Sequence, residues 1–188
     1  MKKGGGKNKG SGFERDICRL LSKWWTDDER DDIFWLTAGS GARATTRSKS
    51  NKKTANQYGD VTFIDELGKP LIDLCLFELK RGYSSKLDLL CTIDKNYAKS
   101  QLYLFWLEAE KEREDAERPF SCLIFKRDRG KECIVISLEF FNKIVDQCGK
   151  FKNCFCELNI ENCDIIILRL SDFLQWVCRE DMCQILTR

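Results

Sequence analysis

Asp60, Glu78 and Lys80 are the residues whose types and spacing best suit a catalytic site. Glu78 and Lys80 lie two positions apart near the end of an apolar segment, so on a β-strand both side chains emerge from the same face. Burying either charge without a partner is expensive. A divalent metal ion would stabilise the two carboxylates, and the Lys80 ammonium could then orient or deprotonate an attacking water. The chemistry that these parts suit is hydrolysis of a phosphodiester; an ordinary surface ion pair across a strand edge is the alternative.

The chain contains no histidine. This absence excludes Ser-His-Asp and Cys-His catalysis, His-ligated zinc enzymes, and nucleases with a histidine base. Any hydrolysis must therefore depend on carboxylates, lysine and a bound metal ion.

A β-hairpin is expected to position the three residues. The sequence predicts strands over 59–64 and 71–80, joined by a turn at 65–70. Asp60 would then open one strand, and Glu78 and Lys80 would lie near the end of its partner.

An N-terminal helix and a short strand are expected before the hairpin. Residues 13–25 place apolar side chains at helical spacing, with Ser11 or Gly12 as the N-cap. The segment 33–37 is typical of a short buried strand.

The rest of the chain alternates further helices and strands. We expect helices at 95–118, 137–147 and 171–186, the last capped by Ser171, a second hairpin at 121–126 and 132–137, and a last strand at 163–170. This order predicts an α/β (α+β) fold in which helices flank a mixed central sheet. With 188 residues, the chain is expected to form a single domain over 13–188, after a flexible basic tail at 1–12.

Basic residues are concentrated in two segments that contain no acid. The formal net charge is only +2, so the rest of the chain is net negative. Both segments are rich in Gly, Ser, Thr and Asn, which predicts a flexible tail and a basic loop at 42–58. Such segments suit contact with a phosphate backbone, although a solvated surface loop is an equally simple reading. The basic residues are Lys2, Lys3, Lys7 and Lys9 in the tail, and Arg43, Arg47, Lys49, Lys52 and Lys53 in the loop.

The eleven cysteines form an odd set in a chain that starts without a secretory signal. We therefore expect reduced thiols in a cytoplasmic compartment. Four of them, Cys148, Cys154, Cys156 and Cys163, fall close enough for a structural zinc site, but they lack the paired spacing of zinc knuckles. No apolar run is long enough to span a bilayer.

Four short motifs occur in an order that resembles the PD-(D/E)xK nuclease superfamily. They are Gly12-Phe13-Glu14-Arg15 on the first helix, Gly39-Ser40-Gly41 after the first strand, Gly59-Asp60, and Glu78-Leu79-Lys80. The wider pattern is similar to archaeal-type Holliday junction resolvases and their phage relatives, with Gly59 in place of the proline that names the motif. The resemblance covers about residues 11–82.

The resemblance implies a role for each matched position. Asp60 and Glu78 would bind Mg²⁺, for which Mn²⁺ can substitute, and Lys80 would be the catalytic lysine. Glu14 would support the metal site directly or through water, while Ser40 and Arg43 would approach the phosphate backbone. A homodimer acting on duplex or branched DNA is also implied.

The function expected from these observations is a metal-dependent DNA endonuclease that acts on branched DNA such as Holliday junctions. The loop between Gly41 and Gly59 is longer than in the resolvases, and the chain continues well beyond the matched region. A sequence-specific restriction-type endonuclease is therefore an alternative, as is a DNA-binding module without catalysis. The sequence leaves DNA specificity and the choice between DNA and RNA open.

Overall fold

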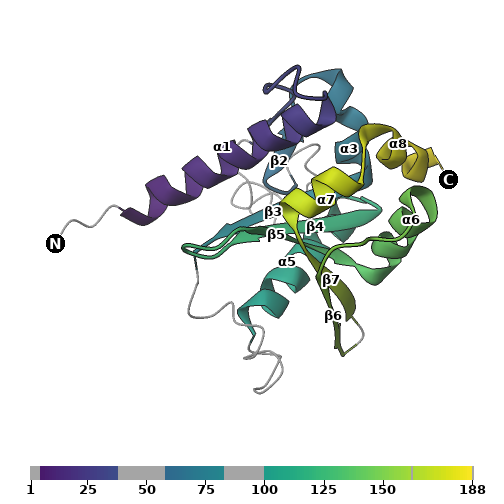
Figure 1. The fold of residues 1–188 in the computed structure, drawn as a ribbon. Helices are drawn as coiled ribbons and strands as arrows, with labels where there is room; N and C mark the ends of the chain where they lie inside the picture. Colours follow the sequence, from purple (N-terminus) through teal and green to yellow (C-terminus); the bar gives the residue numbers. More distant parts are fainter. Residues whose placement is uncertain (1–4, 38–57, 83–99, 162, 188) are drawn as a thin grey trace.

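The computed structural model describes residues 5–37, 58–82, 100–161 and 163–187 (Figure 1). The helices are α1 (Gly5–Trp25), α3 (Lys69–Leu74), α5 (Gln101–Asp115), α6 (Leu138–Cys148), α7 (Leu170–Trp176) and α8 (Arg179–Thr187). The strands are β1 (Phe34–Leu36), β2 (Val61–Phe63), β3 (Cys75–Arg81), β4 (Phe120–Lys126), β5 (Glu132–Ser137), β6 (Phe155–Ile160) and β7 (Cys163–Arg169).

A five-stranded mixed sheet forms the centre of the fold, with the order β3-β4-β5-β7-β6. β3 pairs with β4 in parallel, with Glu78 opposite Leu123, and the other neighbours are antiparallel. β1 and β2 form a separate antiparallel pair. The mixed sheet and its helices confirm the predicted fold class, and they leave β3 as an edge strand.

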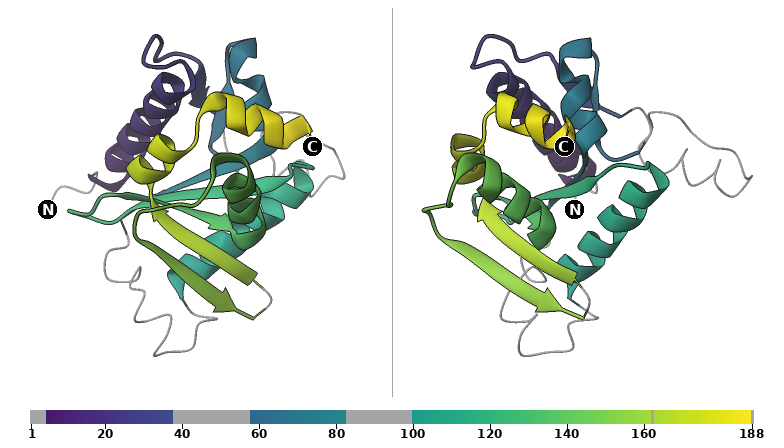
Figure 2. Two further views of the ribbon diagram at one scale, coloured as in Figure 1. Left: turned by 45° about the vertical axis from the view of Figure 1, so that its right-hand side comes forward. Right: turned by 90° about the vertical axis from the view of Figure 1, so that its right-hand side faces the viewer.

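The two faces of the sheet pack against different helices. Along β4, Cys122 and Ile124 belong to the core shared with α1, α3, α6, α7 and α8, whereas Leu123 and Phe125 pack under α5. The views in Figure 2 show α5 on one side of the sheet and the α1, α3 and α8 layer on the other. Because side chains alternate along a strand, Glu78 and Lys80 emerge on the α5 side, opposite to Phe77 and Leu79.

Ser22 joins α1 to β1 inside the core. Its hydroxyl donates to the carbonyl of Cys18 and accepts the backbone N–H groups of Ile33 and Phe34 at 3.1 and 2.9 Å. This contact fixes the helix against the chain that leads into β1. α1 itself begins at Gly5, earlier than the start expected at Ser11 or Gly12.

The predicted hairpin between 59–64 and 71–80 is wrong. Residues 69–74 form α3, β2 pairs with β1, and β3 pairs with β4. Pro70 lies in the first turn of α3, where its missing N–H costs nothing, and the helix buries three apolar side chains. A short apolar run is compatible with either a strand or a helix, which is why periodicity assigned this segment to a strand.

The C-terminal part differs from the prediction at two points. β6 (Phe155–Ile160) was not expected, because apolar and polar residues alternate only weakly in its sequence. The single final helix is interrupted at Val177, whose backbone is extended, and α7 begins after Arg169, so Ser171 is not its N-cap. The remaining strands and helices lie within a few residues of their predicted positions, except that the helix expected at 95–118 is observed as Gln101–Asp115 and residues 95–99 lie outside the described residues.

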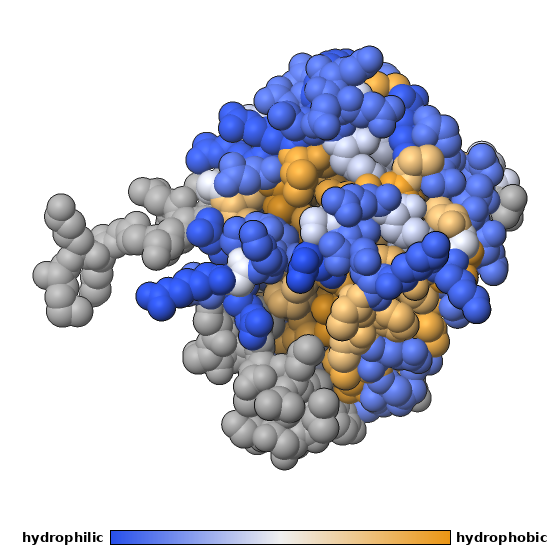
Figure 3. Space-filling view, in the orientation of Figure 1, coloured by the Kyte–Doolittle hydropathy of each residue, from blue (hydrophilic) through white to orange (hydrophobic). Residues whose placement is uncertain are grey.

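Hydrophilic residues cover most of the described surface on the face shown in Figure 3, with apolar residues visible in the middle. Phe155 is one of the exposed apolar side chains and packs against Phe141 and Phe151. No helix within the described ranges has the length and apolarity needed to cross a membrane.

Candidate active site

Asp60 lies along the outer edge of β3, just before β2 begins. Its N–H donates to the carbonyl of Phe77 at 2.7 Å, and its Oδ2 accepts the N–H of Leu79 at 2.8 Å. The Thr37 N–H in turn donates to the carbonyl of Asp60 at 3.0 Å. Backbone groups of the edge strand thus hold both the main chain and the carboxylate of Asp60, although the two segments do not form a hairpin.

Glu78 and Lys80 form an ion pair on the α5 face of β3. Lys80 Nζ lies 2.6 Å from Glu78 Oε1, 3.4 Å from Glu108 Oε2 and 5.0 Å from the centre of the Phe105 ring. The Glu78 side chain is only 10% exposed and that of Lys80 is 21% exposed. Burial alone would lower the pKa of Lys80, but the carboxylates of Glu78 and Glu108 raise it above its usual value. Lys80 is therefore held as an ammonium.

One cavity of about 320 Å³ joins these residues to Glu14. α1 contributes Glu14 to it, β3 contributes Glu78 and Lys80, and Asp60 comes from the segment before β2. The cavity is lined by Glu14, Asp60, Glu78, Leu79, Lys80, Glu108 and Glu112. Five carboxylates and one ammonium from the described residues thus face the same space.

Burial and the neighbouring negative charge of Asp60 raise the pKa values of two carboxyl groups in this cavity. Burial and then the charge of Asp60 raise the pKa of Glu78 to about 7, although Lys80 opposes this shift. Burial and Asp60 also raise the pKa of Glu14. The buried thiol of Cys18 lies one helical turn after Glu14. Burial and the charges of Asp60 and Glu14 raise its pKa to about 12. These shifts indicate a concentration of negative charge that a divalent cation would stabilise.

The donor atoms at this cavity fit a hard cation such as Mg²⁺ or Mn²⁺. Carboxylate oxygens of Asp60, Glu78 and Glu14 line one space, and oxygen ligands are those that Mg²⁺ prefers. Within the described ranges, no three Cys, Asp or Glu side chains already form a set of metal ligands. Glu78 is instead paired with Lys80, so a metal-bound Glu78 would have to contact the metal ion and the Lys80 ammonium at the same time.

The structure therefore brings Glu14, Asp60, Glu78 and Lys80 together, as the sequence predicted. The predicted DNA-binding residues Ser40, Arg43, Arg47, Lys49, Lys52 and Lys53 lie outside the described residues. Of the four cysteines weighed as a zinc site, Cys148 ends α6, Cys156 lies on β6 and Cys163 begins β7.

Sequence reasoning missed the contribution of α5. Phe105, Glu108 and Glu112 follow one another at i, i+3 and i+7, so they share a helical face, and this face lies against β3 and Gly59. The second half of α5 is so rich in charged residues that its sequence is typical of a solvated surface. Only the position of α5 on the sheet distinguishes the carboxylates that face the cavity from those that face solvent.

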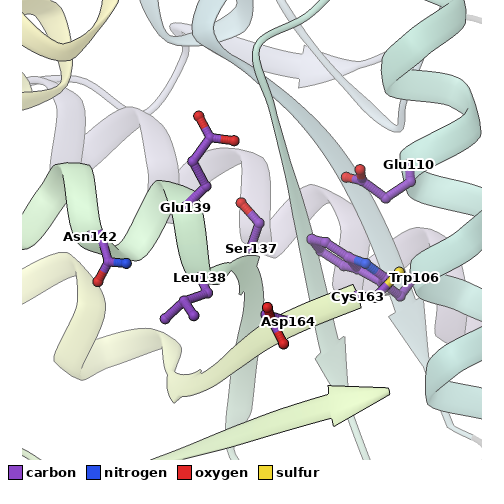
Figure 4. A pocket seen from close by; sticks show the side chains of 8 residues that line it. All are labelled: Trp106, Glu110, Ser137, Leu138, Glu139, Asn142, Cys163 and Asp164. Atoms are coloured by element: carbon purple, nitrogen blue, oxygen red, sulfur yellow. The ribbon is translucent and has the colours of Figure 1, made fainter. Parts of the chain in front are cut away.

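A larger cavity of about 420 Å³ lies between α5, the start of α6 and the start of β7 (Figure 4). It shares no lining residue with the Asp60 cavity. Glu110, Glu139 and Asp164 line it without any lysine or arginine, so among the described residues it offers no cation for a phosphate group.

An acidic residue at the edge of a mixed sheet, with Glu-x-Lys on the edge strand and a further glutamate on the first helix, defines the PD-(D/E)xK class of nuclease. The chain belongs to the family described as "Phage putative PDDEXK endonuclease", whose model matches residues 5–184. Neither the curated proteins nor the solved structures include a significant match. The family and the fold together make this protein a nuclease.

Proposed function

We propose that this nuclease is a Mg²⁺-dependent DNA endonuclease that cleaves branched DNA such as Holliday junctions. The observation that supports the proposal is the convergence of Asp60, Glu78 and Lys80 on one cavity at the sheet edge. Four segments of the chain supply its walls, namely α1, the residues before β2, β3 and α5, and Lys80 is the only cation among the described lining residues.

Asp60 and Glu78 would hold the metal ion, with Glu14 completing the set directly or through a water. When bound, the ion would acidify a water and stabilise negative charge on the phosphate. Asp60 is well prepared for this role, because the Leu79 N–H fixes one of its oxygens while β3 fixes its backbone.

Lys80 would orient the attacking water and stabilise charge that develops on the phosphodiester. Its ammonium is held between Glu78 and Glu108 and lies over the Phe105 ring, so its position is fixed before substrate binds. A lysine kept protonated by two carboxylates donates hydrogen bonds, and this favours an orienting and electrostatic role over that of a base.

The basic residues of 43–53 and the lysines near the N-terminus, of which Lys7 and Lys9 lie in α1, are proposed to bind the DNA backbone. A homodimer would present two such sites to the two strands of a junction. A restriction-type endonuclease is the second candidate, because the described residues beyond the motif form four strands, β4 to β7, and four helices, α5 to α8, some of which would be available to read bases.

Cleavage assays with four-way junctions and linear duplexes of the same sequence test the proposal. Mg²⁺ or Mn²⁺ should support junction cleavage that leaves 5′-phosphate ends, whereas Ca²⁺ should support binding without turnover because its coordination shell is larger and looser. Asp60→Asn and Glu78→Gln should abolish cleavage while DNA affinity remains. Equal cleavage of both substrates would contradict the junction preference, and cutting at one duplex sequence would support the restriction-type candidate.

A further inference from the structure

The chain on the N-terminal side of Asp60 is held by a side chain of α5. The Gly59 N–H donates a hydrogen bond to Glu112 Oε2 at 3.0 Å. Glu112 is half-buried and lines the same cavity as Asp60. Because the β1–β2 ladder begins only at Val61, Gly59 and Asp60 lie outside the strand pairing and depend on other contacts for their position.

Gly59 adopts a conformation that directs neighbouring N–H groups to different partners. Its φ of +69° lies in the left-handed region, and its Cα lies so close to β3 that a Cβ would be 2.8 Å from the carbonyl of Phe77. The Gly59 N–H thereby reaches Glu112 on α5, while the next N–H, that of Asp60, reaches the carbonyl of Phe77 on β3. Helix and strand thus clamp the turn from two sides.

These contacts differ in whether a mutation can remove them. The bonds from Asp60 to Phe77 and from Thr37 to Asp60 join backbone to backbone. The Gly59 N–H, in contrast, donates to the side-chain carboxylate of Glu112. A substitution at Glu112 can therefore remove this bond without changing the main-chain groups. Glu112 is thus the position at which the clamp can be tested.

We propose that Glu112 is a positioning residue, whose carboxylate oxygen fixes Gly59 and thereby holds the Asp60 carboxylate in register with Glu78 and Lys80. The inference rests on the proposed function, because it concerns the same site. Residues that orient a metal ligand without touching the metal typically change metal affinity or activity by roughly 10–100-fold when they are removed. We expect Glu112 to fall in this range.

A rival explanation is that Glu112 acts through its charge, as one more carboxylate that attracts cations to the cavity. Glutamine distinguishes the two, because its amide oxygen can still accept the Gly59 N–H but carries no charge. Glu112→Gln should therefore behave as wild type if the hydrogen bond matters, and Glu112→Ala should not. Matched controls are Glu114→Gln and Glu114→Ala, since Glu114 lies on the same helix, is exposed, and pairs with Arg113 at 3.4 Å.

Three measurements on the full chain test the proposal. They are Mn²⁺ affinity by titration calorimetry, hydrogen exchange of the peptide that contains Gly59 and Asp60, and the single-turnover rate of junction cleavage. In Glu112→Ala we expect faster exchange in that peptide, with Mn²⁺ affinity and cleavage rate each reduced roughly 10–100-fold. Glu112→Gln and both Glu114 variants should stay within about twofold of wild type, and DNA affinity should be unchanged throughout.

Two results would overturn the proposal. One is an unchanged exchange rate or Mn²⁺ affinity in Glu112→Ala. The other is a glutamine variant as impaired as the alanine variant, which would show that the charge is responsible. A wild-type protein that cuts no DNA would contradict the proposed function, whereas faster exchange and weaker Mn²⁺ binding in Glu112→Ala, both absent from Glu112→Gln, would still support the positioning role. Thermal unfolding of each variant identifies any that fail to fold; if Glu112→Ala is one of them, weaker Mn²⁺ binding or slower cleavage in Glu112→Gln would still overturn the proposal.

Discussion

Replacing Gly59 with alanine tests how closely the chain before Asp60 packs against β3. The φ of +69° disfavours an L-residue by about 1–2 kcal/mol. The new Cβ would lie 2.8 Å from the Phe77 carbonyl oxygen, about 0.6 Å closer than an ordinary contact. Because a sheet carbonyl cannot rotate away, this overlap should cost a further 1–3 kcal/mol, approximately. We expect Gly59→Ala to lower the free energy of unfolding by about 2–5 kcal/mol.

Gly82 provides the matched control. Its φ of +94° also disfavours an L-residue, but no atom of the described residues lies within 4 Å of the position that a Cβ would take. Gly82→Ala should therefore cost only about 1–2 kcal/mol. The free energies of unfolding of both variants are measured with urea. The difference between them gives the cost of the overlap with β3, apart from the cost of the backbone conformation. In junction cleavage, Gly59→Ala should also lose about tenfold or more, because Asp60 must move by about half an ångström.

Equal destabilisation by the two alanine variants would refute this reasoning, since it would mean that Gly59 does not touch β3. A stable Gly59→Ala variant with wild-type cleavage would show in addition that the position of Asp60 does not depend on this contact.

Three further predictions concern titration, DNA binding and thiols. The pKa of Glu78 is raised from 4.5 to about 7 in the folded state, so its protonated form stabilises the fold fully below pH 4.5, and this contribution is lost as the pH rises through 7. The free energy of unfolding of the metal-free protein, measured with urea, should therefore fall over this pH window. Glu78→Gln should remove the part of the pH dependence that is due to Glu78. Neutralising the five basic residues of 43–53 should weaken DNA binding and reduce its salt dependence by roughly one unit of slope per lost phosphate contact, whereas an unchanged slope would remove this segment from the interface. Native mass spectrometry should show neither intramolecular disulfides nor bound zinc; one zinc per chain, lost in Cys154→Ser or Cys156→Ser, would contradict this expectation.

The sequence predicts which residues meet at the Asp60 cavity better than it predicts the elements that carry them. Asp60, Glu78 and Lys80 were brought together by their types, their order and a two-residue spacing, all of which are local properties. The pairing of β2 was not predictable, because the apolar segment 71–74 fits a strand and a helix equally well until its packing is known. Asp60 reaches β3 because its N–H donates to the Phe77 carbonyl and its carboxylate accepts the Leu79 N–H, and side-chain patterns do not encode contacts with backbone groups.

The contribution of α5 could not be predicted for a related reason. Glu108 and Glu112 occur among many charged residues, and nothing in the sequence separates them from solvated neighbours such as Glu114. Which face of a polar helix meets the sheet depends on tertiary packing, here of Phe105 and Trp106 against β4. The apolar residues of α5 define its buried face, but they do not indicate that the edge strand β3, with Glu78 and Lys80, lies opposite the charged residues of the helix.

The claim that Lys80 and the adjoining carboxylates form a metal-dependent nuclease site is tested most directly by single-turnover cleavage of a labelled four-way junction. Wild type, Lys80→Ala and Lys69→Ala are compared with Mg²⁺ and with a chelator; Lys69 is the control because it pairs with Asp73 on α3, outside the cavity. The account predicts Mg²⁺-dependent cleavage by wild type and Lys69→Ala, and a loss of about 10²-fold or more in Lys80→Ala. Cleavage in the presence of the chelator, or a wild-type rate in Lys80→Ala, would contradict it.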